Sequence, residues 1–98
     1  MRIYWDLTFE WDEDKAEKNH RKHGVHFAEV LGVFDDPGAV EFFDEQHSSP
    51  SEARYAVIGL ASSGLMYVVF TERGEGRIRL IHARKADKLM VRIYESKE

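Results

Sequence analysis

Apolar and polar residues alternate with different periods along the chain, and each change of period predicts a new element. Loose alternation rich in aromatic residues predicts an opening strand at 7–11. Asp12, a good N-cap, precedes a stretch with acidic residues first and basic residues last, and Gly24 follows it. This order predicts a helix over 13–23, because it suits both caps and the helix dipole. This helix has almost no apolar residues. The residues best placed to face the core are Ala16, Asn19 or His20, and His23.

The later elements follow from the same kind of pattern. Apolar residues at helical spacing predict a second, core-facing helix: Phe27, Val30, Leu31 and Phe34. The pattern then predicts a short strand at 39–43 and a polar, serine-rich loop at 44–52. Three strands joined by tight turns follow at 54–61, 65–72 and 77–83, and a last helix at about 87–95. This order predicts an α+β fold, with helices against one face of the sheet and the other face partly open.

Two of these elements carry charge on one side. Alternation along the strand at 77–83 predicts a core-facing set of Ile78, Leu80 and His82, and an open-face set of Arg77, Arg79 and Ile81. In the last helix, three residues can pack inward: Leu89, Met90 and Ile93. Its outer side then carries a basic stripe of Lys85, Lys88 and Arg92. Because Lys88 and Arg92 repel each other at i,i+4, a purely structural helix has little reason to carry them.

Composition narrows the class of protein. The 98 residues fit one domain, and the absence of cysteine excludes a disulfide framework, a thiolate metal site and a cysteine nucleophile. Neither a signal peptide nor a membrane span is predicted, so we expect a soluble, cytoplasmic protein. The net charge of −4 hides an asymmetry. Residues 1–53 hold thirteen acidic and five basic side chains, whereas residues 54–98 hold five acidic and nine basic ones. The two ends can therefore serve different partners.

The basic second half contains a candidate phosphate site: Arg73, Arg77, Arg79 and Arg84 together with Lys85. Guanidinium groups stay charged and grip phosphate through two hydrogen bonds at once. An equally good interpretation is a solvated sheet face whose cations pair with Glu72, Glu75 and Asp87.

The five histidines suggest acid–base chemistry more than metal binding. His20, His23 and His26 are spaced by three, but Gly24 ends the helix between them, so they cannot share a helical face. We therefore expect no metal site. A histidine, a glutamate and an arginine near one strand edge, His47, Glu52 and Arg54, could supply a base, an acid and a charge stabiliser, or simply be a surface loop with one ion pair.

Four colinear stretches together resemble a known family. They are FEWDEDKAEKNHRKHGVHF at 9–27, FDDP at 34–37, the segment with His47, Ser48, Glu52 and Arg54, and IGLASSG to TERGEGRIRLIHARKA over 58–86, before a helix that ends in RIYE. The chain is similar to the BrnT toxins of bacterial type II toxin–antitoxin pairs over almost its whole length. It departs from the family pattern at His26, where a capping serine is usual, and at His82, where a small residue is more common.

The resemblance implies a fold, an activity and a partner. It implies a single RelE-like toxin domain over 1–98 that cleaves RNA without a metal ion or cofactor and so inhibits translation. It also implies a BrnA-like ribbon-helix-helix antitoxin that neutralises the toxin and represses their shared operon, so that operator DNA is met only through the antitoxin.

Under this resemblance the basic face becomes the RNA-cleaving face. Arg79 and Arg77 are expected to stabilise the charge on the phosphate, with help from Arg54 or Arg73. His23 or His47 is the expected proton carrier, with Glu52 orienting it or acting as base. RNA-backbone contacts are expected from Lys22, Arg73, Arg84, Lys85, Lys88 and Arg92. Two alternatives stay open at this point: a non-catalytic module that only binds an antitoxin or nucleic acid, and a metal-dependent hydrolase that uses the histidines.

Overall fold

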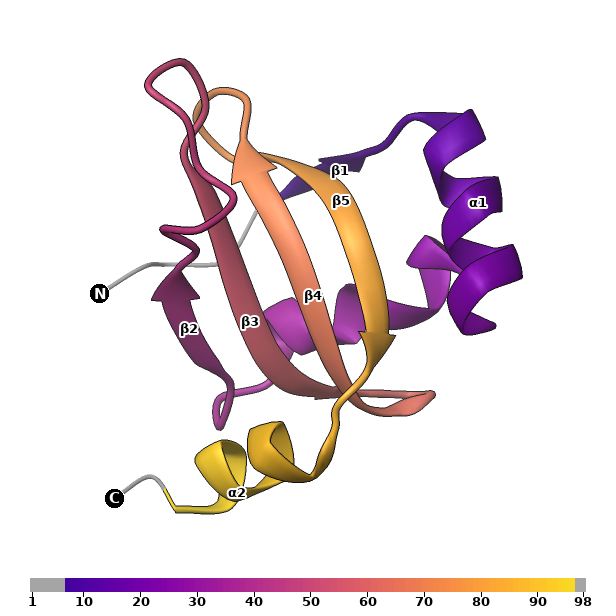
Figure 1. Ribbon diagram of the computed structural model, residues 1–98, viewed down its shortest axis with the longest axis vertical. Helices are drawn as coiled ribbons and strands as arrows, with labels where there is room; N and C mark the ends of the chain where they lie inside the picture. Colours follow the sequence, from indigo (N-terminus) through magenta and orange to yellow (C-terminus); the bar gives the residue numbers. More distant parts are fainter. Residues whose placement is uncertain (1–6, 97–98) are drawn as a thin grey trace.

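Five strands form one mixed sheet in the computed structural model, which describes residues 7–96 (Figure 1). Their order across the sheet is β1-β5-β4-β3-β2. The strands are β1 (Thr8–Glu10), β2 (Val40–Phe43), β3 (Arg54–Ala61), β4 (Gly64–Glu72) and β5 (Arg77–Lys85). The short β1 runs parallel to β5, and all the other neighbours are antiparallel. The predicted α+β fold and its meander are confirmed, and the part of the opening alternation before residue 7 lies outside the described residues.

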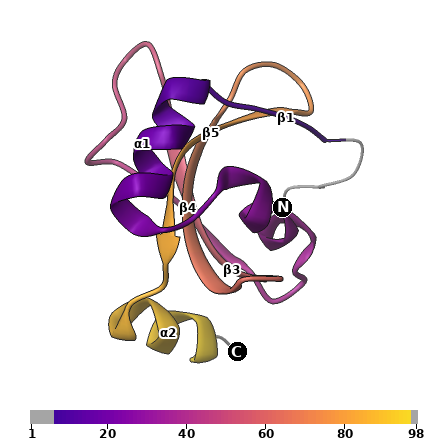
Figure 2. The same ribbon diagram turned by 90° about the vertical axis from the view of Figure 1, so that its right-hand side faces the viewer.

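Three helices surround this sheet. The 3₁₀ helix η1 (Phe27–Asp35) lies across one face, and α1 (Glu13–His23) lies beside β5 beyond the end of β1 (Figure 2). The last helix, α2 (Lys88–Glu95), lies at the end of the sheet, where it contacts β3 (Figure 1). Only η1 therefore covers a sheet face broadly. We call the opposite face of the sheet the open face. No helix among residues 7–96 is long and apolar enough to cross a membrane.

The core lies between η1 and the sheet. Phe27, Val30 and Val33 are buried at every third position, which suits three residues per turn. The predicted α-helical stripe is therefore wrong in detail, since Leu31 is only partly buried and Val33 takes a core place. Close contact with β3 is possible because Gly59 has no side chain, and a Cβ there would meet the Val33 Cβ at 3.0 Å.

The predicted bounds of α1 are confirmed, and both caps have the predicted form. The Asp12 carboxylate accepts a hydrogen bond from the Lys15 amide at 3.1 Å. Gly24 has φ 71° and donates its N–H to the carbonyl of His20 at 2.8 Å. Of the two candidates for the middle of the inward stripe, Asn19 is buried and His20 is exposed. The side chain of Asn19 therefore joins α1 to the rest of the fold.

A register shift in β5 changes which of its residues face outward. Val69 of β4 stands opposite His82 and Phe70 stands opposite Leu80, so Ile81 has no partner on β4. Such a bulge places two consecutive side chains on the same side and reverses the alternation beyond it. The prediction that His82 faces the core is consequently wrong. Ala83 belongs to the core instead, and His82 joins Ile81 on the open face.

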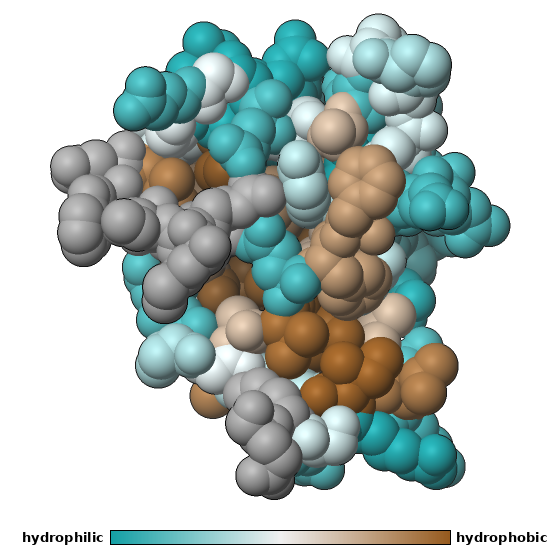
Figure 3. All heavy atoms as spheres, turned by 90° about the vertical axis from the view of Figure 1, so that its left-hand side faces the viewer, coloured by the Kyte–Doolittle hydropathy of each residue, from teal (hydrophilic) through white to brown (hydrophobic). Residues whose placement is uncertain are grey.

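The last helix is also oriented differently from the prediction. Of the three residues predicted to pack inward, Met90 is partly buried, whereas Leu89 and Ile93 are 64% and 38% exposed and do not pack inward. The helix is held mainly at its ends: Asp87 caps its first turn, and the Tyr94 hydroxyl donates to the Asp36 carboxylate at 2.7 Å. Phe42, Phe43 and Leu60 are exposed as well. Figure 3 looks at the side that carries β2 and α2, and apolar residues gather over its lower half.

Candidate functional site

The open face carries a row of polar side chains across the sheet. Register places Glu10 beside Arg79, Arg79 beside Thr71, and Thr71 beside Arg54. Their neighbours along each strand point into the core, so these four side chains lie on the face away from η1. Strands that are far apart in the sequence thus bring two predicted arginines, Arg54 and Arg79, to either side of one threonine.

Glu10 binds the two arginines predicted to stabilise the phosphate. Its Oε1 accepts hydrogen bonds from Arg77 at 3.2 Å (Nε) and 2.9 Å (Nη2), and its Oε2 accepts one from Arg79 at 3.3 Å. The Arg77 hydrogen bond is the main reason that the pKa of the Glu10 carboxyl lies below its ordinary value, and the charges of Arg77, Arg79 and Arg73 add to it. Both guanidiniums are thereby oriented on the open face before any ligand binds.

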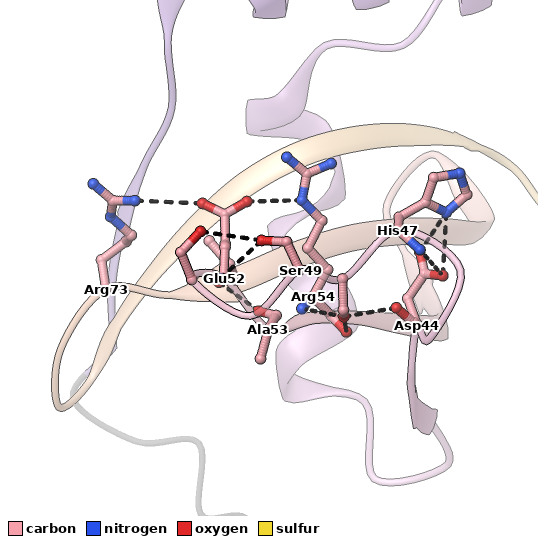
Figure 4. Close-up of polar contacts among 10 residues, drawn as sticks. Asp44, His47, Ser49, Glu52, Ala53, Arg54 and Arg73 are labelled. Carbon is pink, nitrogen blue, oxygen red and sulfur yellow. Dashed lines mark hydrogen bonds and ion pairs between the residues drawn. The ribbon is translucent and has the colours of Figure 1, made fainter.

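Glu52 binds two further arginines, Arg54 and Arg73. One of its oxygens accepts from Nε of Arg54 at 2.8 Å and the other from Arg73 at 3.5 Å, so the carboxylate lies between them (Figure 4). The hydrogen bond from Arg54 is the main cause that lowers the pKa of the Glu52 carboxyl. We call Arg54, Arg73, Arg77 and Arg79 the arginine arc. It holds four guanidiniums around two carboxylates, Glu10 and Glu52.

The loop that carries His47 is fixed to the start of β3. Asp44 is 8% exposed, and its carboxylate contacts Nδ1 of His47 at 2.9 Å (Figure 4). The Ser48 hydroxyl donates to the carbonyl of Asp44 at 2.7 Å and accepts from the Arg54 amide at 2.8 Å. The histidine is therefore held by a buried carboxylate, and Ser48 ties its loop to the arginine arc.

A pocket of about 310 Å³ lies on the open face next to the arc. Residues from β3, β4, β5 and the loop line it: His47, Arg54, Tyr67, Val69, Ile81, His82 and Arg84. Arg54 belongs to both the pocket and the arc. The guanidinium carbon of Arg84 lies 5.0 Å from the centre of the Tyr67 ring, and Nη1 of Arg84 reaches the predicted partner Asp87 at 3.7 Å. The pocket thus combines apolar walls with two arginines and two imidazoles.

His82 lies among aromatic and cationic groups. Its ring meets that of His23 edge-on, with 4.8 Å between centroids, and it meets Tyr67 at 6.3 Å. Burial, followed by the charges of His23, Arg84 and Lys22, lowers the pKa of His82 to about 4. Burial is also the main cause that lowers the pKa of His23, with Lys22 and Arg84 contributing. At neutral pH the His82 imidazole is therefore uncharged.

The structure brings most of the predicted site residues to one face, but not all of them. The arc and the pocket contain the predicted residues Arg54, Arg73, Arg77, Arg79, Arg84, Glu52 and His47, with His23 in contact through His82. Lys22 is near enough to act on both histidines. Lys85, Lys88 and Arg92 lie outside the pocket, at the end of β5 and on α2.

Three residues of this face were missed from the sequence. Glu10 and Tyr67 stand on predicted strands, but nothing in the local pattern shows that their side chains meet Arg77, Arg79 and Arg84. His82 was placed on the wrong face, because a bulge leaves no mark in the alternation of an otherwise apolar and basic strand.

The remaining histidines do not form a metal site with the others. His20 stacks on His26 at 3.7 Å between ring centroids, and both line a separate hollow of about 370 Å³ between α1 and η1. His23 points to His82 instead. Within the described part of the chain, no group of three or more His, Cys, Asp or Glu side chains is arranged to hold a metal ion.

Comparisons with known proteins show which family this chain is similar to. A family model described as the ribonuclease toxin BrnT of type II toxin–antitoxin systems matches residues 11–89. The crystal structure of the Brucella abortus ribonuclease toxin BrnT is similar, with a TM-score of 0.65 and 26% sequence identity. The match covers 84% of this chain and 99% of the Brucella chain. No curated protein sequence matches.

Proposed function

This chain belongs to the BrnT family of ribonuclease toxins of type II toxin–antitoxin systems, and on that premise we propose that its open face cleaves RNA without a metal ion and so inhibits translation. The resemblance drawn from the sequence is confirmed at the level of the family. We also propose that the fold is a variant of the RelE-like toxin fold.

One observation carries the proposal: the arginine arc and the pocket share Arg54. A phosphate held by the arc therefore has its ribose next to the imidazoles of the pocket. RNA needs this combination, because cleavage at the 2′-hydroxyl requires charge stabilisation at phosphorus and proton transfer at the two oxygens beside it.

The arginines supply the charge stabilisation. Arg79 and Arg77 are held in place by Glu10, and Arg54 and Arg73 by Glu52. These guanidiniums are oriented before the substrate arrives, which is the condition under which such donors act most strongly on a transition state. Because both oxygens of Glu52 are bound by arginines and the pKa of its carboxyl is lowered, we assign Glu52 to orienting these arginines and not to accepting a proton.

A histidine supplies the proton for the leaving oxygen. The Asp44 carboxylate engages Nδ1 of His47, which leaves Nε2 as the atom that exchanges a proton with the substrate. We therefore assign His47 as the general acid that protonates the 5′-oxygen. His23 contacts the pocket only through His82, so we give it a supporting role.

Basic residues at the edge of the pocket and beyond it provide further contacts for the RNA backbone. Arg84 lies at the pocket wall, and Lys22 lies near His23. Lys85, Lys88 and Arg92 continue toward α2, so a strand that starts at the arc crosses the pocket and leaves over this helix. Such contacts position RNA without reading its sequence.

We also propose the partner implied by the family, a BrnA-like antitoxin with a ribbon-helix-helix domain. A type II system pairs each toxin with a protein antitoxin, and the shared operator is then bound through the antitoxin alone. Because translating ribosomes and messenger RNA are in the cytoplasm, the proposal includes a cytoplasmic location.

The proposal is tested by exchanging one arginine of the arc. Purified wild-type protein is expected to cut single-stranded RNA in excess EDTA, and Arg79→Ala is expected to lower the rate by about a hundredfold. Arg21→Ala is the matched control, since Arg21 is an exposed arginine on α1 that pairs with Glu17. Cleavage that disappears in EDTA contradicts the metal-free reaction. RNA that is bound but never cut favours a non-catalytic binding module.

A further inference from the structure

The bulge in β5 brings the side chain of His82 to the open face, where it lines the pocket next to the arginine arc. We propose that His82 is the general base that takes the proton of the 2′-hydroxyl, opposite His47 as the general acid. This inference rests on the proposed ribonuclease function and names the second proton carrier that the reaction needs.

The backbone directs His82 into the pocket. Because Ile81 has no partner on β4, the side chains of Ile81 and His82 both lie on the open face and both line the pocket. The His82 ring is held between two other rings, edge-on to His23 at 89° and to Tyr67 at 71°. These two ring contacts orient the imidazole, as a proton-transferring group requires.

The surroundings of His82 keep it ready to accept a proton. The pKa of His82 is lowered mainly by burial, and nearby basic groups add to the effect, so the imidazole is neutral at pH 7. These groups are His23 and Lys22 on α1, Arg84 on β5 and His47 in the loop. Arg54 of β3 and Tyr67 of β4 line the same pocket. A bound phosphate brings negative charge among these cations, which raises the proton affinity of His82 when substrate is present. The base is therefore uncharged in the free protein and becomes stronger in the complex.

The step can be written with all atoms balanced. A ring nitrogen of His82 takes the proton of the 2′-hydroxyl, and the 2′-oxygen forms a bond to phosphorus. The bond between phosphorus and the 5′-oxygen breaks, and that oxygen takes a proton from Nε2 of His47. The products are a 2′,3′-cyclic phosphate and a 5′-hydroxyl end, and the arginine arc holds the negative charge in between.

The other candidates for the base either are bound to neighbouring side chains or lie outside the pocket. Glu52 is bound by two arginines, and His20 and His26 stack on each other in the other hollow. His23 is not among the residues that line the pocket. Among the described residues, His82 and His47 are the two imidazoles that line it, which matches the need for one base and one acid with different environments.

The test measures single-turnover cleavage of a single-stranded RNA against pH. His82→Ala is expected to lower the rate by about a hundredfold or more, to lose the rise of rate with pH, and to regain part of its activity with free imidazole in the buffer. Its affinity for an uncleavable DNA strand of the same sequence is expected to stay within about twofold of wild type. His20→Ala is the matched control, because His20 is an exposed histidine away from the pocket. His82→Gln serves if the alanine variant does not fold.

The outcomes separate this inference from the function on which it rests. If Arg79→Ala loses cleavage and His82→Ala keeps the wild-type rate and pH profile, His82 is not the base, although the ribonuclease proposal stands. A loss that imidazole does not rescue and that leaves the pH profile unchanged also overturns the base role, since it indicates only a packing contribution. If wild-type protein cuts no RNA, both proposals are wrong.

Discussion

Asn19 of α1 binds both backbone groups of Ala83 in β5: its Nδ2 donates to the carbonyl at 2.9 Å, and its Oδ1 accepts from the amide at 3.1 Å. The same Nδ2 donates to the carbonyl of Val25 at 3.1 Å. The strand β1 pairs with β5 only as far as Arg79, so Ala83 has no strand neighbour on that side. One amide side chain therefore takes the place of a strand next to His82.

Asn19→Ala is expected to destabilise the protein by about 2–4 kcal/mol, because it leaves the amide and carbonyl of Ala83 buried without these partners. The free energy of unfolding in urea measures the change. Lys18→Ala is the control, since Lys18 is exposed on the same helix, and its effect is expected to stay within about 0.5 kcal/mol. Equal stabilities of the two variants would show that water satisfies the β5 edge.

The elements whose ends carry their own chemistry were predictable from the sequence. Asp12 and Gly24 set the bounds of α1, and these were correct to the residue. The sequence did not predict that η1 is a 3₁₀ helix, because its apolar residues fit the spacing of an α-helix as well as that of a 3₁₀ helix. Packing against the sheet decides between the two, since it buries Val33 more fully than Leu31. The inward face of α2 was predicted correctly for the partly buried Met90 but wrongly for Leu89 and Ile93, because amphipathic spacing shows that a helix has an apolar side but not that the fold covers all of it.

Glu10→Gln is expected to strengthen RNA binding. The neutral amide frees Arg77 and Arg79 for phosphate, and log affinity against log salt steepens by about 0.7 for each arginine newly bound to a single strand. Fluorescence anisotropy of a labelled, uncleavable DNA strand over a range of KCl concentrations measures both effects. Glu17→Gln is the matched control, since it removes one carboxylate that binds an arginine on α1. Weaker binding of Glu10→Gln would mean that orienting the arginines matters more than freeing them.

His82 is expected to make the fold sensitive to mild acid. Its pKa is about 4 in the folded protein and near its ordinary 6.5 when unfolded, so the unfolded chain binds more protons between these values. Stability is full above pH 6.5 and is lost as the pH falls toward 4. Because the ring is only partly buried, we expect a loss of about 1–2 kcal/mol and not the full value of the shift.

Urea unfolding of wild type and His82→Gln at pH 7.5 and pH 5 measures this loss. The variant is expected to lose less stability than wild type between the two values. The carboxyls of Glu10 and Glu52 also have lowered pKa values, but their contribution is lost only as the pH falls through and below about 4.5. Parallel losses in the two proteins would contradict the assignment to His82.

Ser48→Ala is expected to loosen the loop that carries His47. The substitution removes the acceptor of the Arg54 amide and the donor to the Asp44 carbonyl, at a cost of about 1–2 kcal/mol. Hydrogen exchange of the Arg54 amide is the direct measurement, and faster exchange is expected. Ser51→Ala is the control in the same loop, because the exposed Ser51 contacts only the hydroxyl of Ser49 among the hydrogen bonds described. Unchanged exchange at Arg54 would show that the backbone alone holds the loop.

The candidate site could be predicted as a set of residue types but not as an arrangement. The four arginines of the arc were all named from the sequence, because the sequence shows directly which residues are arginines. The partner Glu52 was also named beside Arg54, but Glu10 was not, because it reaches Arg77 across 67 positions and no local pattern records such a contact. The resemblance to a family added the expected chemistry of the face, but it did not place His82 there, because the bulge in β5 decides which way this side chain points.

The single unpaired residue in β5 sets which way the side chains beyond it point. Deleting Ile81 removes the bulge and restores strict alternation, but it leaves His82 on the open face and Ala83 in the core, because His82 then directly follows the core-facing Leu80. If the same residues paired with β4 without a bulge, His82 would instead face the core and Ala83 the open face. The pairing of β5 with β4, and not the amino-acid type alone, therefore decides whether the histidine reaches the pocket.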